Sequence, residues 1–429
     1  MKINVKVLPL FIAFLLEVLF YSVCKNYLPA KINPIFNSAL SIFIVVYAWK
    51  LWQQNDLEEA SFILLSKNNL TFLKITTVVL ALLVLIYFSF FFKSEPIDIK
   101  RSDIIPVIQQ YYLDRLFNGE FVYTSVDRGT YQWTPNYFPM HWLPFTISNF
   151  LHFDHRLLAL GALILVIIYY SFKIINKSQS IGDAFVKLIL PYTIIFFMRY
   201  DNKIILGHCV ETLICSYYFL FSINIFQGNT FAKSLGLSSI LLSRFSIVLW
   251  TPFYIVSSFL KEKRATIVLC IYSIVFALTL FIIPFLLKDP TIVFKGFDGF
   301  TDVYLLEWKG QSWQAPGDNP YQLFNGLGFA NYFYSFWPGE LVNKIHAIVS
   351  VQLLANILVP VLSFLFMKRF IRNTGIERYQ LLTLKICLLA FYAFIVVPYQ
   401  YLFMVPLFVS VSIVSQFNLF LNCAKKRST

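Results

Sequence analysis

The sequence predicts an all-α protein that crosses a membrane about twelve times and carries two long loops on the extracytoplasmic side. Hydrophobic residues make up 58% of the 429 residues and charged residues only 13%, with a mean hydropathy of +0.67. This composition is typical of polytopic membrane proteins and lies far from that of soluble domains. The formal net charge of +13 indicates basic cytoplasmic loops, and no nucleic-acid partner is expected.

Most of the predicted spans are long apolar runs, since a span needs about 20 residues, or somewhat fewer where the bilayer thins. These runs are Val5–Val23, Pro34–Tyr47, Ile75–Phe92, Leu157–Phe172, Ile204–Phe226, Thr266–Leu287, Ile345–Met367, Leu381–Val397 and Tyr401–Leu421. Three shorter runs need a further argument: Lys187–Phe197, Phe231–Ser243 and Phe245–Leu260.

Basic clusters supply that argument, because short loops rich in Lys and Arg stay in the cytoplasm. The clusters are Lys173/Lys177, Lys261–Arg264, Lys368–Arg372 and Lys425–Arg427, and the long segments expected outside are Lys93–Tyr137 and Pro290–Lys344. One arrangement satisfies both conditions: the shorter runs cross, Met140–Leu151 lies along the outer surface, and both termini are inside. In the alternative, Met140–Leu151 crosses and Phe231–Leu260 forms one helix, which places Lys173 and Lys177 outside.

The preferred arrangement divides the chain into four parts. Residues 1–74 form an extra N-terminal transmembrane hairpin with a cytoplasmic loop, and residues 75–287 form a transmembrane module whose first outer loop covers 93–155. Residues 288–344 form the second outer loop, and residues 345–429 form the C-terminal helices. Met1–Val23 lacks a small-residue cleavage site and should be retained as the first helix.

Asp103 is the first catalytic candidate, because it lies in the first long polar loop, shortly after a membrane helix. A carboxylate there could act as a general base that activates a hydroxyl group. One carboxylate suffices when the leaving group is a phosphate, whereas glycoside hydrolysis uses two. The alternative is an ordinary solvated loop acid.

Arg244 and Asp201 should lie on the same outer side as Asp103. Arg244 interrupts the apolar stretch Gly236–Trp250, where a guanidinium is costly unless it meets an anion, a carboxylate or water. Two short helices that stop partway would leave a cavity open to the outer leaflet, and a planar fork of donors there suits a phosphate. The alternative is an arginine that extends to the membrane surface.

His208 and Glu211 are three residues apart and should share one helix face. Without a third ligand this spacing is a weak indication of a metal site, and the six scattered cysteines form no CxxC pair, so neither metal nor cofactor is expected. A carboxylate inside a membrane helix is a functional candidate, although a self-satisfied His–Glu pair is the alternative. Glu17, in the first helix, could pair within the N-terminal hairpin.

The stretch from Ser102 to His141 resembles the first outer loop of GT-C glycosyltransferases, in which an early Asp is followed by Gly-x-x-x-Tyr and Tyr-x-Pro segments. Here these are Asp103, Gly119–Tyr123 and Tyr137–Pro139. The nearest type is family 87, which depends on polyprenol-phosphate-mannose. Further segments are similar to that family and extend the likeness over roughly residues 75–421: Gly207–Glu211, Leu237–Pro252 around Arg244, and Gln400–Pro406. The departures are Tyr-Phe-Pro for Tyr-Pro-Pro, two extra N-terminal helices, and Asp201-Asn202 for an acid pair.

The resemblance implies a GT-C-like helical bundle that transfers a mannose-like hexose, with inversion, from a polyprenyl-phosphate-sugar donor to a glycan or glycolipid hydroxyl. Asp103 would be the base and Arg244 the donor-phosphate ligand. The residues implied for the substrate cavity are Asp201, His208, Glu211, Tyr137, His141 and Tyr401. The expected location is a bacterial inner membrane, in contact with membrane lipids, with the site facing outside.

Other classes make different demands on the sequence. A secondary transporter would also use intramembrane Glu and Arg, but it usually shows internally repeated halves, and none is visible here. A polysaccharide ligase or polymerase of related fold would take a diphosphate-linked donor and should carry more than one cation at the outer face. A non-catalytic membrane scaffold is the remaining alternative.

Overall fold

The computed structural model describes residues 2–23, 27–54, 65–97, 104–127, 132–178, 180–201, 206–226, 229–311, 314–315 and 319–421. Within this part of the chain, six helices are long and apolar enough to cross a membrane. They are α2 (Asn33–Gln53), α3 (Lys67–Ser94), α8 (His155–Ile175), α9 (Ile181–Asp201), α14 (Lys263–Ala277) with its π-helical continuation η3 (Leu278–Leu286), and α18 (Leu341–Thr374). The predicted all-α membrane protein is therefore confirmed, while the number of about twelve spans stays a prediction.

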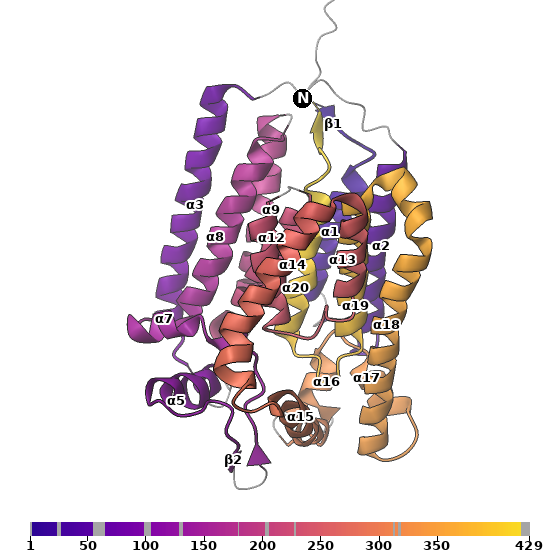
Figure 1. Ribbon diagram of the computed structural model, residues 1–429. Coiled ribbons are helices and arrows are strands. Elements are labelled where there is room, and N and C mark those ends of the chain that lie inside the picture. Colours follow the sequence, from indigo (N-terminus) through magenta and orange to yellow (C-terminus); the bar gives the residue numbers. More distant parts are fainter. Residues whose placement is uncertain are drawn as a thin grey trace, which may run out of the picture.

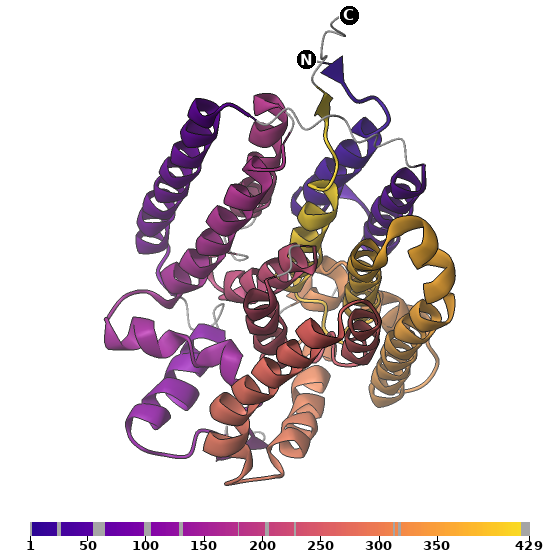
Figure 2. The ribbon, with the colours of Figure 1, turned by 45° about the horizontal axis from the view of Figure 1, so that its top comes forward.

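Shorter helices complete the bundle: α1 (Leu8–Ser22), α11 (Glu211–Ile225), α12 (Thr230–Leu241), α13 (Thr251–Lys261), α19 (Ile376–Ala393), η4 (Gln400–Phe403) and α20 (Met404–Val414). In Figures 1 and 2, α3 lies beside α8 on one flank, while α2 and α18 form the opposite flank. Between them, α11 packs against α8, α12 and α20. In this central position, all but one of the residues of α11 are buried.

The two ends of the bundle differ in character (Figure 1). At one end, here called the terminal end, β1 (Lys2–Ile3) pairs antiparallel with β6 (Phe420–Leu421). The opposite end, here called the loop end, carries the short elements of both predicted outer loops. These are α4 (Ile104–Val107), η2 (Ile108–Leu113), α5 (Asp114–Phe117), β2 (Val126–Asp127), β3 (Gln132–Trp133), α6 (Pro139–Trp142), α7 (Phe145–Phe150), α15 (Ile292–Trp308), β4 (Gln314–Ala315), β5 (Asn319–Pro320), α16 (Tyr321–Asn325) and α17 (Ala330–Phe336).

Several predicted boundaries were wrong near the loop end. Helix α11 begins at Glu211 rather than at Ile204, and α13 begins at Thr251 rather than at Phe245. The second shift has a local cause, because Pro252 suits the first turn of a helix and disfavours a helical residue before it.

The stretch 140–151 forms α6 and α7, and even the six residues of α7 span only about 9 Å, too little to cross a bilayer.

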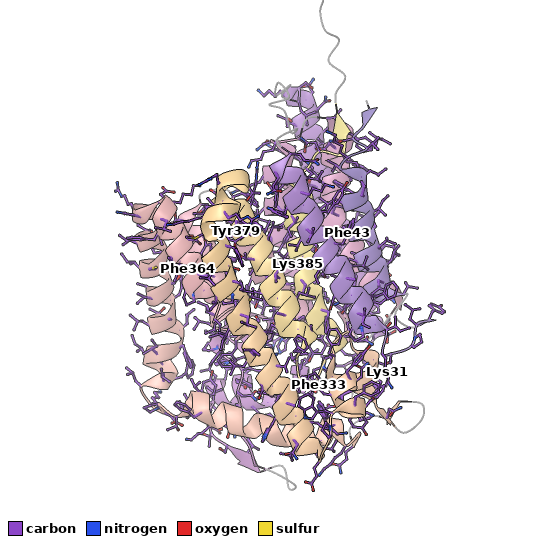
Figure 3. The ribbon with its side chains drawn as sticks, turned by 90° about the vertical axis from the view of Figure 1, so that its right-hand side faces the viewer. Lys31, Phe43, Phe333, Phe364, Tyr379 and Lys385 are labelled. Atoms are coloured by element: carbon purple, nitrogen blue, oxygen red, sulfur yellow. The ribbon has the colours of Figure 1, made fainter. Side chains whose placement is uncertain are left out.

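A buried ion pair joins the N-terminal hairpin to the C-terminal helices. Lys385 of α19, labelled in Figure 3, places Nζ 2.7 Å from Oε1 of Glu17 on α1, and both side chains are almost fully buried. The Glu17 carboxylate also accepts hydrogen bonds from Ser41 of α2 and from Ser410 of α20. Ser41 fits the expected pairing within the hairpin, but the cation comes from the other end of the chain. The hairpin is therefore an integral part of the bundle.

Candidate functional site

A non-helical turn between α12 and α13 places Arg244 against the start of α11. Helix α12 has 12 residues, about 18 Å, and so stops well short of a hydrocarbon core about 30 Å thick. In the turn, Nη2 of Arg244 lies 2.5 Å from Oε2 of Glu211. The side chain of Arg244 is 14% exposed and that of Glu211 is 2% exposed. The guanidinium of Arg244, which lies inside an apolar stretch, is therefore paired with a carboxylate. Such pairing offsets the free-energy cost of a buried charge in a membrane protein.

Gly236 allows α12, and therefore the turn that follows it, to lie close to α11. A Cβ added to Gly236 on α12 would lie 2.9 Å from the backbone nitrogen and the Cβ of Phe221 on α11. Only a residue without a side chain allows the two helix backbones to approach so closely. Glu211 is also the first residue of α11, where the helix dipole favours a carboxylate.

The first-loop helix α6 closes one side of this site. The backbone N–H of Met140 donates to the carbonyl of Leu242 at 2.9 Å, and the hydroxyl of Tyr217 donates to the carbonyl of Met140 at 3.0 Å. The next residue, His141, stacks on Tyr137 with ring centroids 4.4 Å apart. Burial, together with the nearby Arg244, lowers the pKa of His141 from 6.5 to about 3. His141 is therefore neutral at ordinary pH.

Two buried polar atoms around Arg244 have no hydrogen-bond partner within the described residues. They are Nδ1 of His141 and Oε1 of Glu211. Both side chains interact electrostatically with Arg244, and the hydroxyl of Tyr392 on α19 lies beside its guanidinium. An unsatisfied buried polar group costs about 1–3 kcal/mol, so such a group is normally met by water or a ligand. The cluster thus has unused binding capacity.

The chemistry of these atoms indicates what they would bind. The backbone of Ser243 interacts with the His141 ring, and because Nδ1 has no partner, this interaction favours the tautomer with its proton on Nε2. In a neutral imidazole that leaves Nδ1 as a bare acceptor. Oε1 of Glu211 is also an acceptor. Acceptors of this kind call for a ligand with hydroxyl donors, while the N–H groups of Arg244 that Glu211 and Tyr392 do not bind could donate to the oxygens of a phosphate.

A second buried arginine fixes the backbone that leads into Glu211. Arg156, at the start of α8, forms an ion pair with Asp154 at 2.5 Å. Its guanidinium also donates to the carbonyls of Phe92 and Glu95, at the end of α3, and to the carbonyl of Gly207 at 2.6 Å. It therefore ties the start of α8 to the end of α3 and to the segment before α11.

The structure brings together five of the residues predicted for the site, namely Tyr137, His141, Glu211, Arg244 and Tyr401. Tyr401, in η4, stacks on Tyr399 with centroids 5.5 Å apart and interacts electrostatically with Arg244. Tyr392 could not be predicted from the sequence, because a tyrosine in an apolar helix carries no local signal of its partners.

The remaining predicted residues have other outcomes. The prediction that His208 and Glu211 share one helix face was wrong, because His208 is buried in the non-helical segment before α11. Asp103 lies outside the described residues. Asp201 is the last residue of α9, and its side chain is not described. Over the described part of the chain, no group of three or more His, Cys, Asp or Glu residues could hold a metal ion.

In comparisons with known proteins, no family model, no curated protein and no solved structure matches this chain.

Proposed function

We propose that this protein is a membrane glycosyltransferase that moves a hexose from a polyprenyl-phosphate-sugar donor to a hydroxyl of a glycan or glycolipid. The observation that carries the proposal is the cluster around Arg244, in which a cation lies among buried acceptors without partners. A sugar linked to a phosphate combines the two features that such a cluster would bind, an anion and several hydroxyl donors. The predicted topology places the reaction on the extracytoplasmic side.

Arg244 would act on the donor phosphate. When the bond from the sugar to the phosphate breaks, negative charge grows on the phosphate, and a preorganised cation in a low-dielectric site stabilises it. Glu211 holds the guanidinium through Nη2, so the other nitrogens are the groups that would face the phosphate. Because Arg244 is only 14% exposed, side chains of the outer segments must move before a donor enters.

Asp103 is the proposed base, and its chain neighbours support that role. The helical segment that starts at Ile104, one residue after Asp103, is joined to the site by a hydrogen bond. The backbone N–H of Tyr137 donates to the hydroxyl of Tyr112 at 2.8 Å, and Tyr137 stacks on His141. The residues that follow Asp103 are thus connected to the ring that borders the Arg244 cluster.

One observation favours the polysaccharide ligase or polymerase as a second candidate. Arg199, near the end of α9, has a buried Nε without a hydrogen-bond partner among the described residues. Its guanidinium carbon lies 3.9 Å from the ring centroid of Phe91, close to Gly207 in the segment before α11. A second incompletely paired cation would suit a donor with two phosphates. The two candidates therefore differ in the donor linkage.

The test compares donor affinity and single-turnover rate in nanodiscs for polyprenyl-phosphate-mannose and for a polyprenyl-diphosphate-linked sugar. Loss of a preorganised hydrogen-bond donor from a catalytic site typically costs about 3–4 kcal/mol. Arg244→Ala should therefore weaken binding of the monophosphate-linked sugar and slow its turnover together. Arg244→Lys should recover part of the loss. The control is Lys295→Ala, which removes a cation at the loop end that pairs with Asp289 at 2.7 Å.

Arg244→Ala leaves Glu211 buried without its cation, so the double variant Arg244→Gln/Glu211→Gln provides a folded comparison. Unchanged donor affinity and rate in both variants would refute the phosphate role of Arg244. Turnover of the diphosphate donor alone, with a strong loss in Arg199→Ala, would favour the second candidate.

A further inference from the structure

A second candidate binding site lies at the terminal end of the bundle, opposite the Arg244 cluster. A cavity of about 640 Å³ opens where α2 and α18 end and α19 begins. Gly375 makes the connection between α18 and α19 with a φ of +82°, a conformation that L side chains rarely adopt. Two arginines line the cavity, Arg372 from α18 and Arg378 from α19, and Phe226 and Ile371 provide apolar wall.

The charge of this cavity is not neutralised within the described residues. Arg372 and Arg378 form no ion pair there, and the acid on the cavity wall, Glu377, pairs instead with Lys261. The guanidinium of Arg378 is half-buried and lies 5.6 Å from the ring centroid of Trp52. Stacking on an aromatic ring orients a guanidinium but does not cancel its charge. Among the described residues the cavity is therefore electropositive, and the Trp52 ring orients one of its two guanidinium groups.

We propose that this cavity binds a phosphate group, supplied by the headgroup of an anionic phospholipid. Basic pockets between transmembrane helices on the cytoplasmic side bind such headgroups, and arginine forks match phosphate oxygens. The apolar wall from Phe226 and Ile371 suits the glycerol and upper acyl chains, which a free phosphate ion would not use. Under the predicted topology the site faces the inner leaflet, away from the proposed reaction, and it is independent of the proposed function.

The experiment uses the full chain, delipidated and reconstituted into nanodiscs of phosphatidylcholine with increasing phosphatidylglycerol. Native mass spectrometry of the released complex counts the phosphatidylglycerol molecules that stay bound. Each basic side chain near an anionic headgroup contributes a factor of about five to affinity, so Arg372→Ala/Arg378→Ala should weaken binding about thirtyfold. The control is Arg264→Ala, which removes an exposed arginine outside the cavity at the same end.

Arg378 contacts Trp52, so its replacement could disturb folding. Arg372→Glu avoids this, because Arg372 is exposed, and it should weaken phosphatidylglycerol binding at least as strongly as the loss of one cation. Inorganic phosphate at millimolar concentration provides the other arm. Saturable phosphatidylglycerol binding that phosphate does not displace supports the lipid headgroup. Displacement by phosphate, or wild-type phosphatidylglycerol binding in Arg372→Glu, would overturn the proposal.

Discussion

Replacing Lys385 by methionine should sharply destabilise the protein, because it leaves Glu17 without its cation in the middle of the bundle. Nζ of Lys385 lies 2.7 Å from Oε1 of Glu17 and 3.0 Å from the carbonyl of Pro406. Both side chains of the pair are at most 1% exposed, so water cannot replace the lost partner. Ser41 and Ser410 would still donate to the carboxylate, but two neutral hydroxyls compensate a full charge poorly.

The expected loss follows from the burial of this pair. Removing one partner of a buried ion pair costs about 3–5 kcal/mol, because the other charge stays buried and uncompensated. The double variant Lys385→Met/Glu17→Gln removes the orphan charge and should recover most of the stability. The exposed pair Lys295–Asp289 is the control, and Lys295→Met should change stability by less than about 1 kcal/mol.

The assay is reversible unfolding in mixed detergent micelles, followed by tryptophan fluorescence. A loss below about 1 kcal/mol in Lys385→Met would contradict the buried pair, because it would place Lys385 within reach of water. Equal losses in the single and double variants would show that the charge of Glu17 is not the cause.

Three further predictions concern topology, packing and pH. A single cysteine at Gln311 should react with an impermeant reagent added outside and one at Gln179 should not; labelling at Gln179 would restore the alternative topology. Gly326→Ala should lower the unfolding midpoint, because its Cβ would meet a carbonyl oxygen at 2.2 Å, whereas Gly161→Ala, with open space around it, should preserve or raise the midpoint. His141 has a pKa lowered to about 3, so the stability it contributes is complete above its unfolded pKa of 6.5 and is lost as the pH falls. Between pH 7.5 and 5 the loss should be about 2 kcal/mol, and a pH titration of unfolding on His141→Asn should show a flatter slope.

The sequence predicted the helical membrane architecture because apolar runs carry that information locally. The predicted spans overlap helices in the structure, but their ends differ from the helix ends by up to eight residues. The errors fall where tertiary contacts, not periodicity, decide the backbone. Residues 208–210 are apolar enough to continue a helix, yet they are non-helical beside the Arg156 bond to Gly207.

Pairings between distant segments could not be predicted from the sequence. Glu211 was a candidate because a membrane carboxylate stands out, but nothing local shows that its partner is Arg244, 33 residues later. Lys385 lies in an apolar run that gives no sign of its role, although its ion pair with Glu17 attaches the N-terminal hairpin to the C-terminal helices. Tyr392 was missed for the same reason, since its importance comes from its neighbours and not from its own segment.

The most direct test of the proposed glycosyl transfer follows radiolabelled mannose from polyprenyl-phosphate-mannose into acceptor, catalysed by the purified protein in nanodiscs. Membranes of a host strain that lacks the gene supply the acceptor, and wild type is compared with Asp103→Asn. Transfer by wild type and a loss of about 10²–10⁴-fold in the variant, with donor binding retained, are the predicted results. Absence of transfer by the wild-type protein, or equal transfer by wild type and Asp103→Asn, would contradict Asp103-dependent transfer from this donor.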